Sequence, residues 1–483
     1  MAVALLVGQC QFKTMALHIH RILHAGYLFT AGDFRLLIDP IFESPFSNNC
    51  FAYPDVKFDL AMIAQLKFSA VVISHFHDDH CSFESLRHLD RATPIYIFCR
   101  FEKMHLLLKE LGFRNVQGLQ LNLPVELGPF QITARRAVQS DVDSILQIEI
   151  EDLNILNVVD SEIDRPTLAL LKSERPWDLI LWPFQIMRET EVLDPRRAQD
   201  LPVRDILREM AAQIKILSPR ILVPSSCQFQ MEAGSWYNQS FFAVSYQEFS
   251  SAVMENLLQP GPSIVRMNPG VGYQLSSQAF VRLPNLEWAQ GIGEQDLDYT
   301  YSPNFKAPPT SELARRWPAL TETQRQALEE YLTVTLPLRY CEIGPPAGLY
   351  FNRTVRWELR TYDQLGQARS HWYEVREDQM KLRPAPMPII SPILVEATRP
   401  RTESTTAEWR TDISEYKLLS AVENGEALNS IYLRVNDCEF DHQIEEKLKS
   451  ADVMMDPLIR CLYDGAFGSY QESQLRRIRE RDQ

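Results

Sequence analysis

Short apolar runs and longer amphipathic segments alternate along the first 285 residues. The run FSAVVIS predicts a buried strand over Ala70–Ile73, and ILNVVD, WDLILWPF and RILVPSS predict further strands. Apolar residues three and four positions apart predict helices in FEKMHLLLKELGF and VRDILREMAAQIKIL. Turns at residues 31–33 and 151–152 predict β-hairpins. Strands that alternate with helices after a hairpin-rich start predict a layered α/β sandwich.

The pattern changes after about residue 285, where several prolines interrupt a stretch with little periodicity. A helix is predicted to begin at Thr321, with Gln324 placed for a capping box. Alternating residues in GLYFNRTVRWELRTYD and SHWYEV predict strands, and YKLLSAVEN and PLIRCLYD predict helices. We therefore expect an N-terminal extension 1–14, a first domain 15–285, a linker and wrapping helix 286–345, and a C-terminal α+β domain 346–483. The charged run RRIRERDQ is expected to be a solvated helix end.

Charge and composition narrow the class of protein. The 483 residues carry a net charge of −14, which argues against a nucleic-acid partner because phosphate contacts need clustered Lys and Arg. No apolar run reaches the length of a membrane helix, and MAVALLVGQC lacks the basic residues of a signal peptide. Met15 is an alternative start. The eight cysteines are scattered without a CxxC pair, so we expect free thiols and a cytoplasmic location.

Four ligand-type residues follow the strand Ala70–Ile73 directly, in the segment SHFHDDH. His75 and His77 stand one residue apart, so both side chains are expected on the same side. Asp79 and His80 follow at once and can turn toward a second point a few ångströms away. Imidazole suits zinc or iron, and the carboxylate adds charge that favours a divalent or trivalent ion. The spacing therefore predicts two metal ions, although an exposed polar loop is the alternative.

The order H-x-H-x-D-H after a short apolar strand resembles the metallo-β-lactamase superfamily. FRLLIDPIF, ILNVVD and RILVPSS fall where that fold has its other recurrent strands, and the resemblance covers about residues 16–285. It implies an αββα sandwich and a metal-dependent enzyme of unspecified reaction. The family's metal-bridging aspartate ends the strand after the hairpin, which implies that role for Asp160. A strand-end turn residue is the alternative.

Two departures from the family pattern concern its other histidines. The family's third histidine lies before the hairpin, where this sequence has Gln139, Asp141 and Asp143. Its late histidine is absent too, because SSCQ follows RILVP. Either Asp141 or Asp143 completes the site as a carboxylate ligand, or a single metal is held and both are turn residues. Gln139 occupies the position of the missing histidine, but a neutral amide is a weak ligand, so it is expected beside the site.

This pattern of loss is similar to the metal domain of the CMP-N-acetylneuraminate hydroxylase family. The matching segments are LHAGYLF, ISHFHDDH, SDVDS, ILNVVD, SPRILVP and AVENGEALNSIYLRV. That family implies an oxygenase with a Rieske iron–sulfur domain, but this chain has no Cys-x-His pairs for such a centre. Electrons would therefore come from an external donor or from the substrate. The match also implies that His24 hydrogen-bonds a ligand carboxylate, with a satisfied core histidine as the alternative.

Three classes of function follow, and we favour the first. It is a non-heme iron monooxygenase, with one or two irons, that hydroxylates a small-molecule or carrier-tethered substrate. The second is a zinc or manganese hydrolase of an ester, lactone, amide or phosphodiester, with Asp79 or Asp160 as the catalytic group that orients water. The third is a scaffold with a degenerate site. Trp357, Trp372 and Tyr373 are expected to cover the active site or to form the surface of a homodimer.

Overall fold

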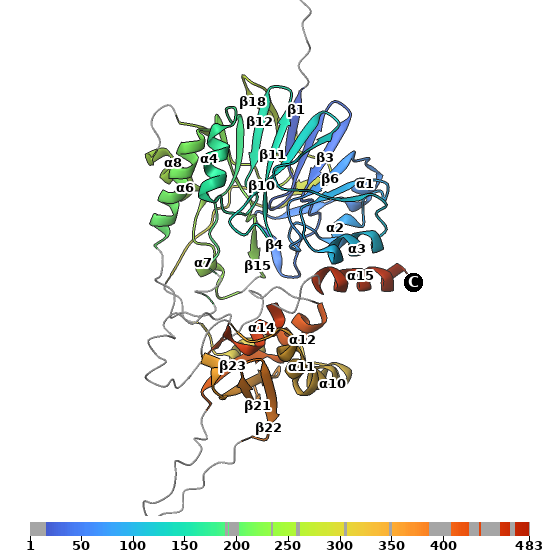
Figure 1. The fold of residues 1–483 in the computed structure, drawn as a ribbon, viewed down its shortest axis with the longest axis vertical. Helices are drawn as coiled ribbons and strands as arrows, with labels where there is room; N and C mark the ends of the chain where they lie inside the picture. Colours follow the sequence, from blue (N-terminus) through green and yellow to red (C-terminus); the bar gives the residue numbers. More distant parts are fainter. Residues whose placement is uncertain are drawn as a thin grey trace, which may run out of the picture.

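Figure 1 shows the computed structural model of the chain: two stacked β-sheets with flanking helices, and a smaller sheet with its own helices below them. The structure describes residues 16–188, 192, 202–232, 235–256, 261–303, 307–346, 350–385, 407–424, 434–435, 455–463 and 469–482. The expected extension 1–14, Met15 and most of AVENGEALNSIYLRV therefore lie outside the described residues.

Two large sheets form the first domain. The strands of the first sheet are β1 (Leu17–Arg21), β2 (Tyr27–Ala31), β3 (Phe34–Ile38), β6 (Ala70–Ile73), β7 (Ile95–Ile97), β8 (Val116–Gly118), β17 (Gly272–Leu275) and β18 (Phe280–Leu283). Those of the second are β9 (Pro124–Leu127), β10 (Phe130–Arg136), β11 (Ser144–Ile150), β12 (Leu153–Asn157), β13 (Leu179–Pro183), β14 (Ile221–Ser225) and β16 (Ser263–Ile264). Their spatial orders are β18-β17-β1-β2-β3-β6-β7-β8 and β16-β14-β13-β12-β11-β10-β9. Two short pairs stand outside these sheets, β4 (Cys50–Ala52) with β15 (Phe229–Met231) and β5 (Val56–Phe58) with β19 (Ala289–Gly291).

Helices cover the outer faces of both sheets (Figure 1). On the side of the first sheet lie α1 (Leu60–Gln65), α2 (Phe83–Leu86) and α3 (Glu102–Glu110), and on the side of the second lie α4 (Arg165–Ser173), α6 (Val203–Leu217) and α8 (Tyr246–Asn256). The short α7 (Asn238–Phe241) lies near β15. This arrangement confirms the αββα sandwich. No helix among the described residues is both long and apolar enough to cross a membrane.

The central strands are apolar on both faces because each face meets a different core. In β6, Ala70 and Val72 contribute to the core between the two sheets, whereas Val71 and Ile73 contribute to the core under the helices. This explains why FSAVVIS is continuously apolar instead of alternating. The predicted hairpins are confirmed as well, since β2 pairs antiparallel with β3 and β11 pairs antiparallel with β12.

Parallel strands bring the ends of several loops to one edge of the sandwich. In the first sheet β3, β6 and β7 run parallel, and in the second β12, β13 and β14 do so. The carboxyl ends of parallel neighbours meet at the same edge. The two edges are joined there by the Ser144 hydroxyl, which donates to the Ser74 carbonyl at 2.7 Å. The segments after β3, β6, β12 and β14 therefore converge.

A second unit of the chain is built on a five-stranded sheet in the order β22-β21-β20-β23-β24. Its strands are β20 (Val355–Tyr362), β21 (Ala368–Arg376), β22 (Gln379–Arg383), β23 (Trp409–Ser414) and β24 (Arg434–Val435). The helical segments of this part of the chain are α9 (Thr310–Ala314), α10 (Glu322–Glu330), η2 (Tyr331–Thr335), α11 (Leu336–Glu342), η3 (Tyr350–Asn352), α12 (Glu415–Asn424), α14 (Pro457–Tyr463) and α15 (Ser469–Asp482). The additional α+β unit matches the expected fold class, and the capping box of Thr321 and Gln324 is confirmed.

Packing in this unit differs from two of the expectations. The helices predicted to wrap the chain, α10 and α11, supply Leu328 and Tyr340 to the apolar core of the second unit. Trp357 and Tyr373 are also core residues, 0% and 1% exposed, with ring centroids 4.9 Å apart. These two aromatic residues therefore cannot form the cover or dimer surface expected of them, because the sheet face that carries them is covered by helices.

Asp456 joins β23 to the start of α14 inside this core. It is fully buried, and its Oδ2 accepts hydrogen bonds from Trp409 Nε1, at 2.8 Å, and from the Thr411 hydroxyl. Its Oδ1 accepts the backbone N–H groups of Leu458 and Ile459, at 2.9 and 3.1 Å. Four donors thus depend on one carboxyl group.

We expect Asp456→Ala to lower the free energy of unfolding of the second unit by about 3 kcal/mol, because buried donors lose their acceptor and α14 loses its cap. Urea denaturation followed by tryptophan fluorescence measures the change. The control is Glu342→Ala, an exposed carboxylate of the same unit, which should change stability by less than about 0.5 kcal/mol. Equal losses in both variants would contradict the role of Asp456.

Candidate metal centre

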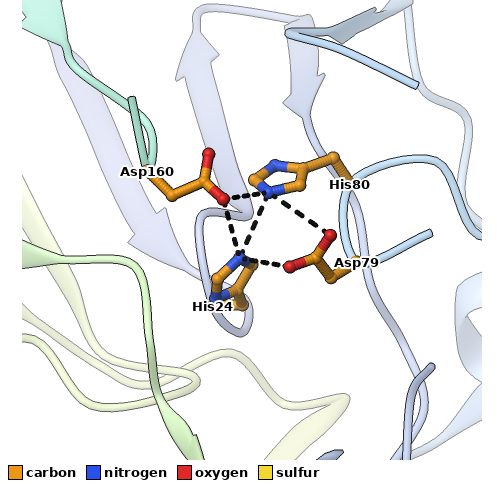
Figure 2. Close-up of side chains that lie close together, drawn as sticks. All are labelled: His24, Asp79, His80 and Asp160. Carbon is orange, nitrogen blue, oxygen red and sulfur yellow. Dashed lines mark hydrogen bonds and ion pairs between the residues drawn. The ribbon is translucent and has the colours of Figure 1, made fainter. Parts of the chain in front are cut away.

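Ligand-type side chains gather in two groups at the converging loop ends. One group consists of His75, His77 and Asp143. The other consists of His24, Asp79, His80 and Asp160, which Figure 2 shows facing one another. Within each group the ligand atoms lie within 4.8 Å of one another. The four residues of the SHFHDDH motif are therefore divided between two neighbouring points, two residues to each.

Local backbone structure explains how three loops deliver these side chains. After β6, the His77 carbonyl accepts the N–H groups of His80 and Cys81, at 3.1 and 2.8 Å, so the chain turns sharply within the motif. After β12, the Asn157 side chain accepts the Val159 N–H at 3.0 Å, and Val159 adopts a left-handed φ of 64°. This turn directs Asp160 back toward β6, which explains why a residue just beyond the strand faces the histidines.

The first group has the geometry of a shared ligand position. His75 Nε2 lies 2.9 Å from His77 Nδ1 and 3.9 Å from Asp143 Oδ1. With metal–nitrogen bonds of about 2.1 Å, two ligands at right angles on one ion are separated by roughly 3 Å. The separation of the two imidazole nitrogens therefore suits adjacent positions on one ion.

A buried carboxylate fixes which nitrogen of each histidine is available. Asp39, at the end of β3, accepts the Ser74 hydroxyl at 2.6 Å and lies 3.0 Å from His80 Nδ1. Because the hydroxyl hydrogen of Ser74 is directed at Asp39, the Ser74 oxygen acts as the acceptor for His75 Nδ1, which lies 3.0 Å away. Both Nδ1 atoms thus carry protons, and both Nε2 atoms are left to bind a cation. Hydrogen bonds of this kind orient metal-binding histidines in proteins.

His24 has the opposite tautomer to His75 and His80, and its role in the site therefore differs from theirs. The backbone N–H of Cys227 donates to His24 Nδ1 at 2.9 Å, so that nitrogen is an acceptor. The proton of the neutral ring is then on Nε2, 3.2 Å from Asp79 Oδ2 (Figure 2). A protonated Nε2 cannot bind a cation. The geometry therefore favours His24 as a hydrogen-bond donor to Asp79, although its Nε2 also lies 3.2 Å from His80 Nε2, within ligand distance of the second group.

The segment that lacks the family's late histidine supports His24 instead. Ser226 and Cys227 adopt left-handed φ angles of 52° and 46°, and this turn presents the Cys227 N–H to His24. The fully buried Arg21 guanidinium donates to the carbonyls of His24, Pro224 and Ser226 and so fixes this segment to the His24 loop. This segment thus supplies a backbone donor to His24 and is held in place by Arg21.

Burial and charge shift the pKa values of the cluster in opposite directions. Burial lowers the pKa of His75 well below its usual value, and the His80 charge adds to this. Burial would also lower the pKa of His80, but the charges of Asp160 and Asp79 raise it well above its usual value. Burial raises the pKa of Asp143 to about 7, and the charge of Asp160 adds to this. The cluster therefore has an excess of buried negative charge, which protons must offset when no other cation is present.

The residues fit a pair of divalent cations. Oδ1 of Asp143 and Oδ1 of Asp160 are buried, and neither has a hydrogen-bond partner among the described residues. Buried carboxylate oxygens are normally hydrogen-bonded or bound to a metal. Together with Asp39 and Asp79 they make four carboxylates, whose charge two divalent cations would balance. We conclude that the donor set is suited to two metal ions.

The other two predicted residues lie apart from the cluster. Asp141 is 75% exposed and forms an ion pair with Arg100, so the choice between the two aspartates falls on Asp143. Gln139 is exposed, but its backbone carbonyl accepts the N–H groups of Val142 and Asp143, at 2.9 and 2.8 Å. Gln139 therefore acts on the site through the turn that delivers Asp143, and not through its amide.

Three residues that contribute to the site were not identified from the sequence: Asp39, Ser74 and Arg21. Asp39 and Ser74 each follow a strand of the first sheet directly, and these strands, β3 and β6, are parallel neighbours. Their position could have identified them from the sequence, because polar residues at the ends of adjacent parallel strands lie close together. For Arg21 the chain gave no such signal, since two of its three carbonyl partners, Pro224 and Ser226, lie about 200 residues away.

A polar cavity of about 340 Å³ opens beside the SHFHDDH loop. It is lined by Glu43, Pro45, Asn48, Glu84, Tyr470, Gln474 and Arg477. None of these residues belongs to the two ligand groups. Burial raises the pKa of Glu43 to about 8, so this side chain is largely protonated near neutral pH. Two of its lining residues, Glu43 and Gln474, hydrogen-bond Ser82 and Phe83 just after the SHFHDDH segment, so the cavity adjoins that end of the loop.

Comparison with known proteins shows similarity of structure but not of sequence. No protein-family model matches the sequence, and no curated protein matches it. Solved structures of metallo-β-lactamase-fold proteins are similar to about half of the chain. YhfI from Bacillus subtilis is 15% identical, with a TM-score of 0.36, over 54% of this chain and 100% of its own. Igni18, a metallo hydrolase from Ignicoccus hospitalis, is 15% identical, with a TM-score of 0.39, over 54% of this chain and 99% of its own.

A hydroxylase is also similar to about half of the chain. CmlA, a diiron β-hydroxylase from Streptomyces venezuelae, is 14% identical, with a TM-score of 0.38, over 54% of this chain and 54% of its own. At such identities and TM-scores these likenesses decide nothing about the reaction of this chain. The resemblance to the CMP-N-acetylneuraminate hydroxylase family likewise stays a prediction.

We expect Asp39→Ala to lower the affinity for a divalent metal about 10- to 100-fold, because His75 and His80 lose the groups that orient them. Competition between the protein and a chromophoric chelator for Co²⁺ measures the affinity. Asp33→Ala is the matched control, since Asp33 is an exposed carboxylate in the hairpin that precedes β3. Unchanged affinity in Asp39→Ala would show that the imidazoles are held by packing alone.

Proposed function

We propose that the chain is a non-heme diiron oxygenase that hydroxylates a small-molecule or carrier-tethered substrate. The observation that carries this proposal is the composition of the first ligand group. His75, His77 and Asp143 are two imidazoles and one carboxylate, a set typical of non-heme iron sites that activate O₂. Replacement of the family's third histidine by Asp143 therefore favours iron over zinc, since oxygen donors favour harder ions.

The second group and a shared carboxylate support two irons. Asp79, His80 and Asp160 would hold the second ion, with His24 directing its Nε2–H to Asp79. Asp160 faces both groups, because its Oδ1 lies 3.9 Å from His75 Nε2 and its Oδ2 lies 3.0 Å from His80 Nε2. A carboxylate with an oxygen toward each group could serve both ions, and its charge would reduce the repulsion between two nearby cations.

The reaction balances with an external reductant. Hydroxylation of a C–H bond by O₂ inserts one oxygen atom and releases the other as water, which requires two electrons and two protons. Two irons, held by the two ligand groups, would supply the site at which O₂ is reduced. We propose that a reduced redox protein supplies the electrons, because the sequence has no Cys-x-His pairs for an iron–sulfur centre of the Rieske type.

The residues of the chain hold and orient the reacting groups. Asp39 and Ser74 keep His75 and His80 in the tautomers that expose Nε2. His24 holds the orientation of Asp79 through its Nε2–H. Asp79 and Asp160 each have an oxygen near the imidazole nitrogens, where either carboxylate can accept a proton from a bound water or substrate.

Hydrolysis is the second candidate. Asp79 or Asp160 would orient a water whose pKa a zinc or manganese ion lowers, and this hydroxide would attack an ester, lactone, amide or phosphodiester. The specific observation in its favour is that the two ligand groups adjoin, as in hydrolases with paired metals. Hydrolases and a hydroxylase both occur among the similar structures, so metal preference and O₂ consumption must decide.

We expect protein produced in iron-supplemented medium to retain about two irons per chain, as the two ligand groups require, and to give visible absorption that dithionite bleaches. Addition of dithionite-reduced protein to aerated buffer should consume O₂ in proportion to the bound iron. The measurements are elemental analysis, absorption spectroscopy and an oxygen electrode. Protein produced with zinc is the control. Tight retention of zinc alone, without O₂ consumption by the iron-grown protein, would contradict the oxygenase and support the hydrolase.

We expect Asp143→Ala to lower iron content toward one per chain, because the first group loses its carboxylate. Asp141→Ala is the matched control: it removes the same side chain two residues away, from the exposed ion pair with Arg100, and should leave the iron content unchanged. Both variants are compared by iron analysis and by circular dichroism, which checks folding. Equal iron loss in the two variants would show that the turn, and not the Asp143 carboxylate, matters.

A further inference from the structure

The last described helix of the chain lies against the metal domain and not within the second unit. In Figure 1, α15 lies beneath α2 and α3, beside the segment that carries the SHFHDDH motif. Its residues Leu475 and Ile478 belong to the apolar core of the metal domain. The charged run forms the end of this helix, and Arg476 and residues 479–482 are exposed, as expected of a solvated helix end, whereas Ile478 is buried against the domain.

One buried amide of this helix reaches both sides of the ligand segment. Gln471 Nε2 donates to the Phe76 carbonyl at 2.9 Å and lies 3.5 Å from the Cys81 carbonyl. Phe76 stands between His75 and His77, and Cys81 directly follows His80. A single side chain thus spans the stretch of backbone that carries His77, Asp79 and His80.

A second amide one turn later holds the exit of the segment. Gln474 Oε1 accepts the Phe83 N–H at 2.7 Å, and its Nε2 donates to the Ser82 hydroxyl oxygen at 3.1 Å. Ser82 in turn caps α2 and donates to Glu43. Gln471 and Gln474 are 3% and 0% exposed. Burial of an amide is unfavourable unless the amide is hydrogen-bonded. The hydrogen bonds to the loop therefore fix the positions of the two glutamine side chains, and the same hydrogen bonds restrain the loop.

The exposed contacts of α15 act on other parts of the domain. Arg479 pairs with Glu110 of α3 at 3.0 Å, with side chains 55% and 51% exposed. Lys103 pairs with Glu472 at 2.9 Å, with side chains 46% and 49% exposed. Such pairs contribute only about 0–1 kcal/mol each, and neither touches residues 74–83. The buried amides are therefore the contacts through which α15 acts on the ligand segment.

The same helix is tied to the second unit. The Ser473 hydroxyl donates to the Glu423 carbonyl in α12 at 2.9 Å, and Arg476 donates to the same carbonyl at 2.7 Å. α12 supplies Leu418 and Leu419 to the core of the second unit. α15 is thus hydrogen-bonded on one side to the metal-binding loop and on the other to α12.

We propose that Gln471 and Gln474 are positioning residues of the metal centre, by which the second unit sets the conformation of the loop that holds His77, Asp79 and His80. The inference rests on the proposed metal centre and adds to it a contribution from the opposite end of the chain. Loss of either amide leaves its hydrogen-bond partners in the loop unsatisfied and lets the ligand segment change shape. Metal binding, and not only stability, should then respond.

The test uses the full-length protein with Gln471→Met and Gln474→Met, which keep the length of the side chain and remove its hydrogen bonds. Arg479→Ala is the matched control on the same helix. Each protein is loaded with Co²⁺, and we measure its visible spectrum, the rate of Co²⁺ transfer to an excess of chelator, and the unfolding temperature. We expect transfer about tenfold faster in both Met variants, with a changed visible spectrum, and wild-type values for the control.

Two results would overturn the inference and can be told apart from failure of the proposed function. Met variants with a lower unfolding temperature but a wild-type spectrum and transfer rate would show that α15 only stabilises the domain. Faster transfer in Arg479→Ala, equal to that of the Met variants, would show a general effect of helix docking. Wild-type protein that binds no metal would instead refute the metal centre itself. Gln471→Asn, which draws the amide back by one methylene, replaces any Met variant that fails to fold and should show the same faster transfer.

Discussion

The arrangement of the candidate metal centre depends on one buried carboxylate, Asp39. It accepts the Ser74 N–H at 2.7 Å and the Ser74 hydroxyl at 2.6 Å, and it lies 3.0 Å from His80 Nδ1. Ser74 hydrogen-bonds both Asp39 and His75, and Asp39 also hydrogen-bonds His80. The tautomers of two imidazoles in one loop are therefore set by a residue that follows another strand, β3. Hydrogen bonds to a charged group are strong in a buried site, so they hold the loop in addition to the apolar packing of Phe76 and Cys81.

The same concentration of charge links folding to metal binding. Asp39, Asp79, Asp143 and Asp160 are brought together at one edge of the sandwich, where few cationic side chains oppose them. Without another cation, protons must serve: burial raises the pKa of Asp143 to about 7, and neighbouring carboxylates raise that of His80 well above its usual value. A divalent cation would displace these protons and take the same positions. The site is therefore built for ions of high charge, and the folded domain should gain stability when they bind.

Local sequence was sufficient for the strands and for the ligand motif, because both are read over a few residues. The apolar run Ala70–Ile73 and the capping box at Thr321 are examples. Contacts over long separations could not be predicted: Asp39 is 35 residues from Ser74, and Gln471 is 395 residues from Phe76. The choice of Asp143 over Asp141 also needed the structure. Asp141 lies within the turn and Asp143 at its end, and only the geometry of the turn sends one carboxylate to the surface and the other to His75.

The contacts from α15 to the ligand segment are made by neutral glutamines, which leaves the charge of the candidate metal centre unchanged. A lysine or arginine at these positions would add a positive charge beside the ligand segment and compete with the metal ions for the carboxylates. A glutamate would add another negative charge beside the buried Glu43, whose pKa burial already raises to about 8. Glutamine offers a donor and an acceptor without net charge, so Gln471 and Gln474 can fix the backbone of the loop while the metal ions alone offset the aspartates. Neutral contacts thus allow the second unit to restrain the loop without altering the electrostatic field of the aspartates that bind the cations.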